Sequence, residues 1–200
     1  MLTSLTNLAD PAVLLPLAIA ILIWLLAMRS AVAAAWWLIA VAICIGGTAL
    51  LKIYFFACPP MTDLHSPSGH TSLGTLVYGT LFMFVAAETR RWKRWVMTAV
   101  GALFILSIAA SRQLLHAHTA LEVWLGLLIG SVALATFTKS YLSHHPMRVW
   151  LQPLVLAVVI LMVIFHGHEL RAEEVLDKIS AYLEIAKRMC ISNISIGAFA

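Results

Sequence analysis

The 200-residue chain has few charged residues, and this scarcity excludes most classes of soluble protein. Only 11% of the residues are Asp, Glu, Lys or Arg, whereas 62% are hydrophobic. A soluble domain has roughly a quarter of its residues charged, so the balance indicates an integral membrane protein. The net charge of +4 does not point to nucleic acid, because the one dense basic run, residues 90–94, adjoins an apolar segment.

The sequence also lacks the short alternating segments of a membrane β-barrel. No Lys or Arg occurs in residues 1–10, so a cleaved signal peptide with its basic start is not expected there. Continuous apolar runs near the length that crosses a bilayer, about 20 residues, predict an all-α polytopic bundle of about six transmembrane helices. These runs are Pro11–Met28, Ala31–Ala57, His70–Ala87, Trp95–Ala110, Thr119–Phe137 and Trp150–Phe165.

One membrane domain and one amphipathic tail account for the sequence. We expect residues 1–168 to form the transmembrane domain, with the first helix starting at Asp10-Pro11, because Asp caps helices and Pro opens them. In residues 169–200, the stretch 169–189 has apolar residues at helical spacing among charged ones, which predicts an amphipathic helix on the membrane surface. Residues 190–200 have no interpretable pattern.

The cations indicate an orientation, because short cytoplasmic loops of membrane proteins carry an excess of Lys and Arg. They concentrate in the first, third and fifth connections, at Arg29, at Arg90, Arg91, Lys93 and Arg94, and at Lys139 and Arg148. We therefore expect a multi-pass protein of the cell (inner) membrane, with both chain ends and the second and fourth connections facing the periplasm or the cell exterior.

The second connection carries the first group of candidate functional residues. Three prolines keep it out of helical geometry, and it ends at Pro67-Ser68-Gly69-His70, where a helix is expected to start. Backbone amides at a helix start, the hydroxyl of Ser68 and the close approach that Gly69 permits form a cradle for phosphate oxygens. The alternative is that this segment merely caps the helix.

The fourth connection carries the second group, Ser111-Arg112 followed by His118 and Glu122. Residues four apart share a helix face, so the carboxylate of Glu122 can reach the imidazole of His118. A carboxylate on one ring nitrogen fixes the tautomer and leaves the other nitrogen as a nucleophile. The residue four positions after His116 is Ala120, so the spacing selects His118. The alternative is that this His and Glu only complement the helix dipole.

Together these fragments resemble the type 2 phosphatidic acid phosphatase superfamily, the membrane lipid-phosphate phosphatases that share an active site with vanadium haloperoxidases. The family's second motif, Pro-Ser-Gly-His, is intact at Pro67–His70. Its third motif is Ser-Arg, five residues, His, three residues, Asp. Here Ser111, Arg112 and His118 stand at that spacing, with Glu122 in the Asp position.

The family's first motif, Lys, six residues, Arg-Pro, is only partly present. Lys52 and Pro60 match it, while Pro59 occupies the position of the arginine. By resemblance that arginine helps to neutralise the phosphate, and a protonated His65 is the candidate substitute here. Lys52 also has an alternative interpretation, as a cation that extends from the end of a long helix to the membrane interface.

The resemblance implies an enzyme, a phosphoric monoester or diphosphate hydrolase that acts on lipid phosphates through a phosphohistidine intermediate. The implied catalytic residues are His118, His70 and Glu122, and the implied phosphate-binding residues are Lys52, Ser68, Gly69, Ser111 and Arg112, with His65 as an auxiliary. No cofactor or metal is expected, because no pair of the clustered histidines has the i, i+4 spacing of a zinc metalloprotease motif.

The expected partners are the membrane and a lipid phosphate or pyrophosphate, without nucleic acid or an obligatory protein partner. The absent arginine keeps a second function open, that of a catalytically weakened or inactive relative that binds lipid headgroups or assists lipid transport. An unrelated transporter would have polar residues deep in several helices, and these segments contain almost no charge. The residues do not distinguish between lipids, because a groove for hydrocarbon is made of generic apolar side chains.

Overall fold

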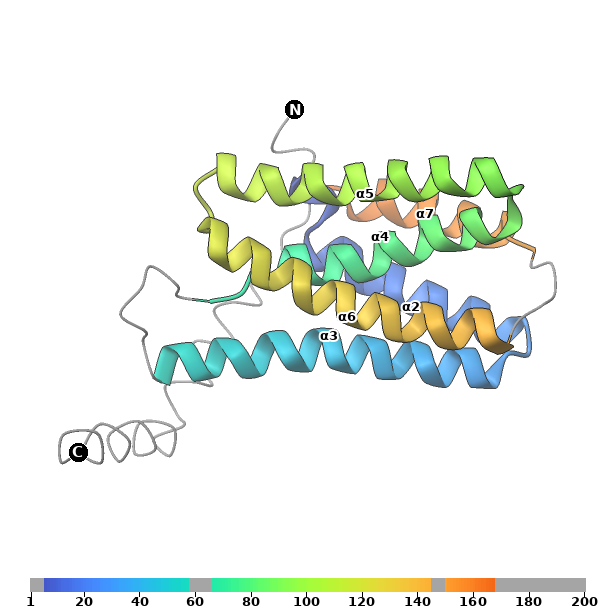
Figure 1. The fold of residues 1–200 in the computed structure, drawn as a ribbon, viewed down its shortest axis with the longest axis horizontal. Helices are drawn as coiled ribbons and strands as arrows, with labels where there is room; N and C mark the ends of the chain where they lie inside the picture. The colour runs from blue at the N-terminus through green and yellow to red at the C-terminus, as the bar shows by residue number, and fades with distance from the viewer. Residues whose placement is uncertain (1–5, 58–65, 145–149, 168–200) are drawn as a thin grey trace.

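The computed structural model describes residues 6–57, 66–144 and 150–167 (Figure 1). Its long elements are the helices α2 (Pro11–Ala27), α3 (Ala31–Ala57), α4 (Gly69–Glu88), α5 (Arg91–Leu114), α6 (Ala120–His144) and α7 (Gln152–Phe165). The all-α class is therefore confirmed for the described residues, with a helix at each expected place. Pro59, Pro60, His65 and the expected amphipathic helix at 169–189 lie outside these residues.

Four of these helices are long and apolar enough to cross a membrane, by length and composition. The candidate spans are Ala31–Phe55, Gly69–Glu88, Arg91–Leu114 and Ala120–Ser143. The helices α2 and α7 have 17 and 14 residues, fewer than the about 20 that cross the hydrocarbon core. A multi-pass membrane protein is thus compatible with the structure, whereas the expected count of six spans is not confirmed.

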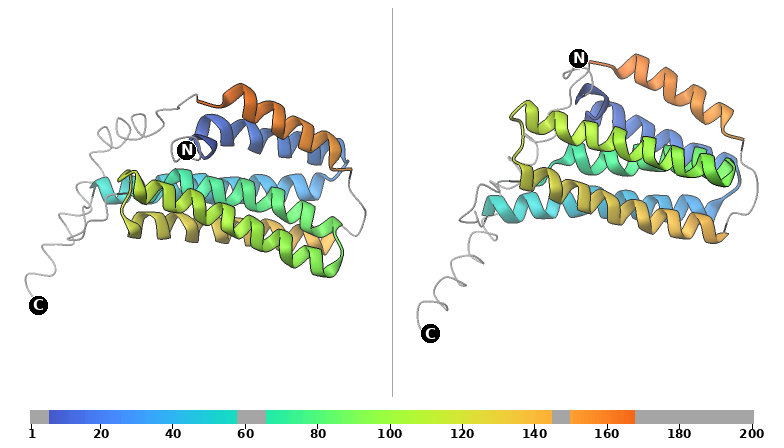
Figure 2. Two further views of the ribbon diagram at one scale, coloured as in Figure 1. Left: turned by 90° about the horizontal axis from the view of Figure 1, so that it is seen from above. Right: turned by 45° about the horizontal axis from the view of Figure 1, so that its top comes forward.

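The helix α4 lies at the centre of the bundle. It packs against α2, α3, α5 and α6, while α7 lies on the outer side of α2 (Figures 1 and 2). The side chain of Ser68, the N-cap residue, accepts the N–H of Thr71 at 3.4 Å. Because α4 is surrounded by four helices, the residues of its first turn lie among the ends of its neighbours.

Two glycines four residues apart bring α6 close to α4. A Cβ atom at Gly126 would lie 2.6 Å from the carbonyl oxygen of Ser68, and one at Gly130 would lie 2.4 Å from that of Ser72. Small residues at this spacing let the backbones of membrane helices approach closely. The contact fixes the start of α4 against the first half of α6.

We expect the Gly130→Ala variant to unfold at a lower temperature in detergent. Its new methyl group would meet a backbone carbonyl that moves only if α4 and α6 separate, and overpacking of this kind costs about 1–3 kcal/mol. Gly46→Ala is the matched control, because a Cβ at Gly46 has nothing within 4 Å and Ala favours a helix over Gly. Equal unfolding temperatures for the two variants would contradict the close α4–α6 contact.

The helix α5 extends beyond the expected segment Trp95–Ala110 at both ends, from Arg91 to Leu114. A hydrophobic run includes only the apolar residues, whereas the flanking charged residues are also helical. The guanidinium of Arg94 donates to the carbonyl of Ala86 at 3.2 Å and to that of Ala87 at 3.4 Å, at the end of α4. A cation stabilises a helix C-terminus in this way, so Arg94, one of the basic residues at the start of α5, has a partner at the end of α4.

Candidate active site

The predicted site residues gather at one end of the bundle, where α4 and α6 begin and α3 and α5 end (Figure 1). Ser68, Gly69 and His70 lie at the start of α4, Lys52 near the end of α3, Ser111 and Arg112 near the end of α5, and His118 and Glu122 at the start of α6. His65 lies outside the described residues.

Glu122 holds this end of the bundle together. Its Oε2 accepts hydrogen bonds from His118 Nδ1 at 2.9 Å and from the backbone N–H of Thr119 at 3.1 Å. Its Oε1 accepts the N–H of Ser66 at 2.9 Å, and its backbone carbonyl accepts the N–H of Ser68 at 3.0 Å. One residue therefore joins the third predicted motif to the second.

The His118–Glu122 pair is shielded from water, with each side chain 6% exposed. An ionised carboxylate only accepts hydrogen bonds, so the contact assigns the proton of the neutral imidazole to Nδ1 and makes Nε2 the basic nitrogen. A carboxylate on one ring nitrogen fixes the orientation of a histidine and also stabilises its protonated form. The expected contact between the two residues is thus present.

A helix cap, rather than helical spacing, brings His118 and Glu122 together. His118 precedes α6, which starts at Ala120. Thr119 Oγ1 accepts the N–H of Glu122 at 3.4 Å, while the carboxylate of Glu122 accepts the N–H of Thr119. This reciprocal pair is a capping box. The dipole-only alternative does not account for these bonds or for the bond to Ser66.

His116 has a different place from His118. It is exposed, its φ is +53°, and its N–H donates to the carbonyl of Gln113 at 2.9 Å. A residue in the left-handed region is a common way to end a helix, and here it ends α5. The structure therefore separates the two histidines in the way that the sequence spacing predicts.

The segment Pro67–His70 does cap α4, and its capping role does not exclude a ligand. The Oγ atom of Ser68 accepts from the N–H and the hydroxyl of Thr71, so its own O–H can still donate. A Cβ at Gly69 would come no closer than 3.9 Å to Thr48. Packing inside the protein therefore does not require glycine at this position.

Lys52 is only 4% exposed, so protein covers it and it does not extend to the interface. It lies one helical turn after Thr48, whose Oγ1 is 3.0 Å from Ser72 Oγ on α4. Residues four apart share a helix face, so Lys52 lies on the face of α3 that is turned towards the start of α4. A nearly buried lysine is rare unless an anionic group accompanies it.

The structure adds a contact of His70 that the sequence does not predict. Asp10 caps α2 as expected, since its Oδ1 accepts the N–H of Ala12 at 2.8 Å. Its second carboxylate oxygen, Oδ2, lies 3.5 Å from His70 Nε2. The two residues are far apart in the chain, and no local pattern signals their contact.

The residues just before α2 also contact α5 and α4. Thr6 Oγ1 lies 2.9 Å from Ser111 Oγ, which donates in turn to the carbonyl of Ile108 at 2.7 Å. The hydroxyl of Tyr78 donates to the carbonyl of Leu8 at 2.5 Å. Ser111, a predicted phosphate-binding residue, is therefore fully buried and held by the segment 6–10.

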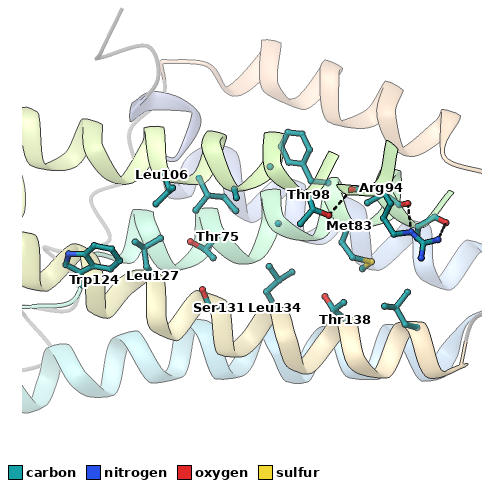
Figure 3. Close-up of a pocket in the computed structure, with 18 residues that line it drawn as sticks. Thr75, Met83, Arg94, Thr98, Leu106, Trp124, Leu127, Ser131, Leu134 and Thr138 are labelled. Atoms are coloured by element: carbon teal, nitrogen blue, oxygen red, sulfur yellow. Dashed lines mark hydrogen bonds between the residues drawn. The ribbon is translucent and has the colours of Figure 1, made fainter. Parts of the chain in front are cut away.

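An open groove of about 600 Å³ runs along the bundle. Its lining residues come from α4, α5 and α6, and Trp124 and Arg94 lie towards its opposite ends (Figure 3). It starts at Thr75 and Trp124, a few residues beyond His70 and Glu122. Trp124 is 63% exposed, so the groove opens on the outside of the bundle.

The wall of the groove is mostly apolar. Its lining includes large side chains such as Phe82, Leu127 and Leu134. The hydroxyls of Thr75 and Thr98 donate to carbonyls of their own helices, at 2.7 and 3.0 Å. Because these hydroxyls are already bonded, the threonines present mainly their methyl groups.

Within the described ranges, the titratable residues form no group of three or more that could hold a metal ion. The candidate site consists of two histidine–carboxylate pairs, two cations and the amides at a helix start. No protein-family model, curated protein or solved structure matches this chain.

Proposed function

We propose that this chain is a membrane phosphatase that hydrolyses a lipid phosphate or pyrophosphate through a phosphohistidine on His118. The observation that carries the proposal is the 2.9 Å contact between His118 Nδ1 and the buried carboxylate of Glu122. It makes Nε2 the basic nitrogen of an oriented ring, as nucleophilic attack requires. His70, Lys52 and Arg112 lie at the same end of the bundle, and the sequence resemblance gives them matching roles.

In the first step, Nε2 of His118 attacks phosphorus, and a phosphorus–nitrogen bond forms while the bond to the lipid oxygen breaks. A protonated His70 gives its proton to that oxygen, so the lipid leaves as an alcohol or, from a pyrophosphate, as a monophosphate. Water then attacks the phosphohistidine, His70 takes a proton from it, and phosphate leaves. Lys52 and Arg112 offset the phosphate charge, because phosphoryl transfer depends on positioning and electrostatics.

The groove between α5 and α6 supports a lipid as the substrate. It is apolar and open to the outside, and it starts at Trp124, two residues after Glu122 on α6, so a hydrocarbon chain in it would leave the phosphate near the end of the bundle that carries His118. Inside a bilayer a lipid gains little hydrophobic energy by moving into such a groove, because lipid tails are as apolar as leucine. The groove would therefore orient the chain rather than attract it.

The distribution of Lys and Arg supports a site on the periplasmic or extracellular face of the cell membrane. Arg29 follows α2 and Arg91 begins α5, so both lie at the opposite end of their helices from Asp10 and Arg112. If the cation-rich end is cytoplasmic, the site lies at the outer membrane surface. A substrate would then enter sideways from the outer half of the bilayer.

Pro59 favours a second candidate function. The resemblance places an arginine there, and loss of one charged contact to a transition state often costs on the order of 10²–10³ in rate. A relative with so weak a site would bind lipid headgroups, or assist lipid transport, without turnover. This alternative differs from the proposal in one measurable quantity, the release of phosphate.

Trapping of the intermediate tests the proposal. The purified protein in detergent micelles is mixed with a lipid carrying a radioactive terminal phosphate, tested separately for phosphatidic acid, phosphatidylglycerophosphate and a polyprenyl pyrophosphate, and quenched within one turnover. We expect free phosphate from at least one lipid and a labelled protein that keeps its label in alkali and loses it in acid, because a phosphorus–nitrogen bond is acid-labile. Binding of all three lipids without release of phosphate would refute the phosphatase and leave the headgroup-binding relative.

A further inference from the structure

We propose that Asp10 is a positioning residue for His70, one that holds the protonated imidazole in place while it donates to the leaving lipid oxygen. This inference rests on the proposed phosphatase function. Asp10 belongs to none of the three motifs that the sequence resemblance covers. It is the N-cap residue of α2, a helix that carries none of the motif residues.

The carboxylate of Asp10 has a fixed orientation. Its Oδ1 is occupied by the N–H of Ala12 at 2.8 Å, which leaves Oδ2 directed at His70 Nε2 at 3.5 Å. The side chains of Asp10 and His70 are 9% and 14% exposed. The distance is within ion-pair range but long for a hydrogen bond. Contacts of catalytic groups are often long without substrate and shorten in its presence.

The start of α2 is anchored to the helix that carries His70. The carbonyl of Leu8 accepts the hydroxyl of Tyr78, and a Cβ at Gly74 would lie 3.9 Å from Ala9 and from Leu14. Asp10 lies between these contacts in the sequence. Asp10 therefore keeps a fixed position relative to α4 and to His70.

The chemistry of this pair follows from its charge and its shielding. A carboxylate beside an imidazole stabilises the imidazolium more strongly where water is largely excluded. With Asp10 at Nε2, the proton for the leaving oxygen comes from Nδ1 of His70. The two histidines thus have opposite arrangements: Glu122 contacts Nδ1 of His118, the nucleophile, and Asp10 contacts Nε2 of His70, the acid.

The test is Asp10→Asn, because Asn caps helices about as well as Asp and removes only the charge. Release of the alcohol or the nitrophenol in the first turnover is measured with two substrates that carry the same hydrocarbon tail, an alkyl phosphate and a nitrophenyl phosphate, because the later hydrolysis of the phosphohistidine uses His70 with both. An alkoxide leaves poorly without a proton, whereas a nitrophenolate leaves without one. A residue that supports proton donation therefore affects the first substrate much more than the second.

General acid catalysis contributes roughly 10²–10⁴ in rate. We expect Asp10→Asn to lower the first-turnover rate of leaving-group release by about 10²-fold for the alkyl phosphate and by less than about threefold for the nitrophenyl phosphate. His70→Ala should give the same pattern with a larger first loss. The double variant should be no slower than His70→Ala alone, because both changes remove one effect. Glu88→Gln, a carboxylate at the far end of α4, is the charge control and should leave both rates unchanged.

Equal losses on the two substrates would overturn the inference, because they would indicate a structural role for Asp10. Unchanged rates on both would overturn it as well. If the wild type releases phosphate and depends on His118 while Asp10→Asn lacks the expected contrast, only the role of Asp10 is wrong. If the wild type releases none, the phosphatase and the inference fail together.

Discussion

Phosphate release from lipid phosphates is expected to fall by a factor on the order of 10⁴–10⁶ when His118 is replaced by Ala, as it does in other enzymes that lose their nucleophile. In this connection, His118 is the histidine whose ring is oriented by a carboxylate. His116, two residues away, is exposed and ends α5. The variant should also form no acid-labile phosphoprotein, since the bond that would be trapped is the one to His118.

His116→Ala is the matched control for His118→Ala, because it removes the same side chain from the same connection. We expect its activity to remain within about twofold of the wild type, as for most exposed substitutions away from a site. Full activity in His118→Ala, or an equal loss in both variants, would contradict the assignment of the nucleophile. Both variants should unfold at nearly the wild-type temperature, because the bonds from Glu122 to Ser66 and Thr119 remain in each.

Substitutions of Glu122 are expected to have the second largest effect and to separate its two roles. Glu122→Gln keeps the size of the side chain but removes the charge that orients His118, so we expect kcat to fall by about 10⁴-fold, as when other histidine–carboxylate pairs lose their charge. Glu122→Ala removes in addition the acceptor for the N–H groups of Ser66 and Thr119. Each buried donor left without an acceptor costs about 1–3 kcal/mol.

The measurements for this series are phosphate release and thermal unfolding in the same detergent. Glu122→Gln should lose activity with a smaller fall in unfolding temperature than Glu122→Ala, because its amide oxygen can still accept from one side of the contacts that the carboxylate makes. Glu122→Asp retains the charge that the resemblance expects in this position, but it is one methylene shorter and cannot keep all three contacts. We expect it to retain more activity than Glu122→Gln. The reverse order would show that reach, rather than charge, is what His118 requires.

The sequence predicts the parts of this molecule that depend on neighbouring residues. Continuous apolar runs are enough to locate the helices, and spacing alone separates His118 from His116. Hydrophobic runs do not predict the ends of α5, because they exclude charged residues such as Arg94, which is helical and donates hydrogen bonds to the end of α4. The Thr-x-x-Glu pattern of Thr119 and Glu122 is that of a capping box, and it predicts a helix that starts directly after Thr119, as α6 does.

The parts that were not predicted depend on residues distant in the chain. Nothing near Asp10 in the sequence indicates His70 as a neighbour, because the contact arises only when α2 packs on α4. The glycines of α6 are likewise ordinary residues of an apolar run until the carbonyls of Ser68 and Ser72 lie against them. Burial of Lys52 has the same origin, since an isolated α3 would leave that side chain in contact with lipid or water.

The sideways opening of the groove between α5 and α6 has a consequence for the direction of the proposed reaction. The dephosphorylated lipid can diffuse back into the bilayer, whereas inorganic phosphate dissolves in the aqueous compartment. The two products would then seldom meet again at the protein, and resynthesis of the phosphorylated lipid would be rare even with the enzyme present. Partition of the lipid into the bilayer and of phosphate into water would help to make the hydrolysis effectively irreversible without any coupled source of energy.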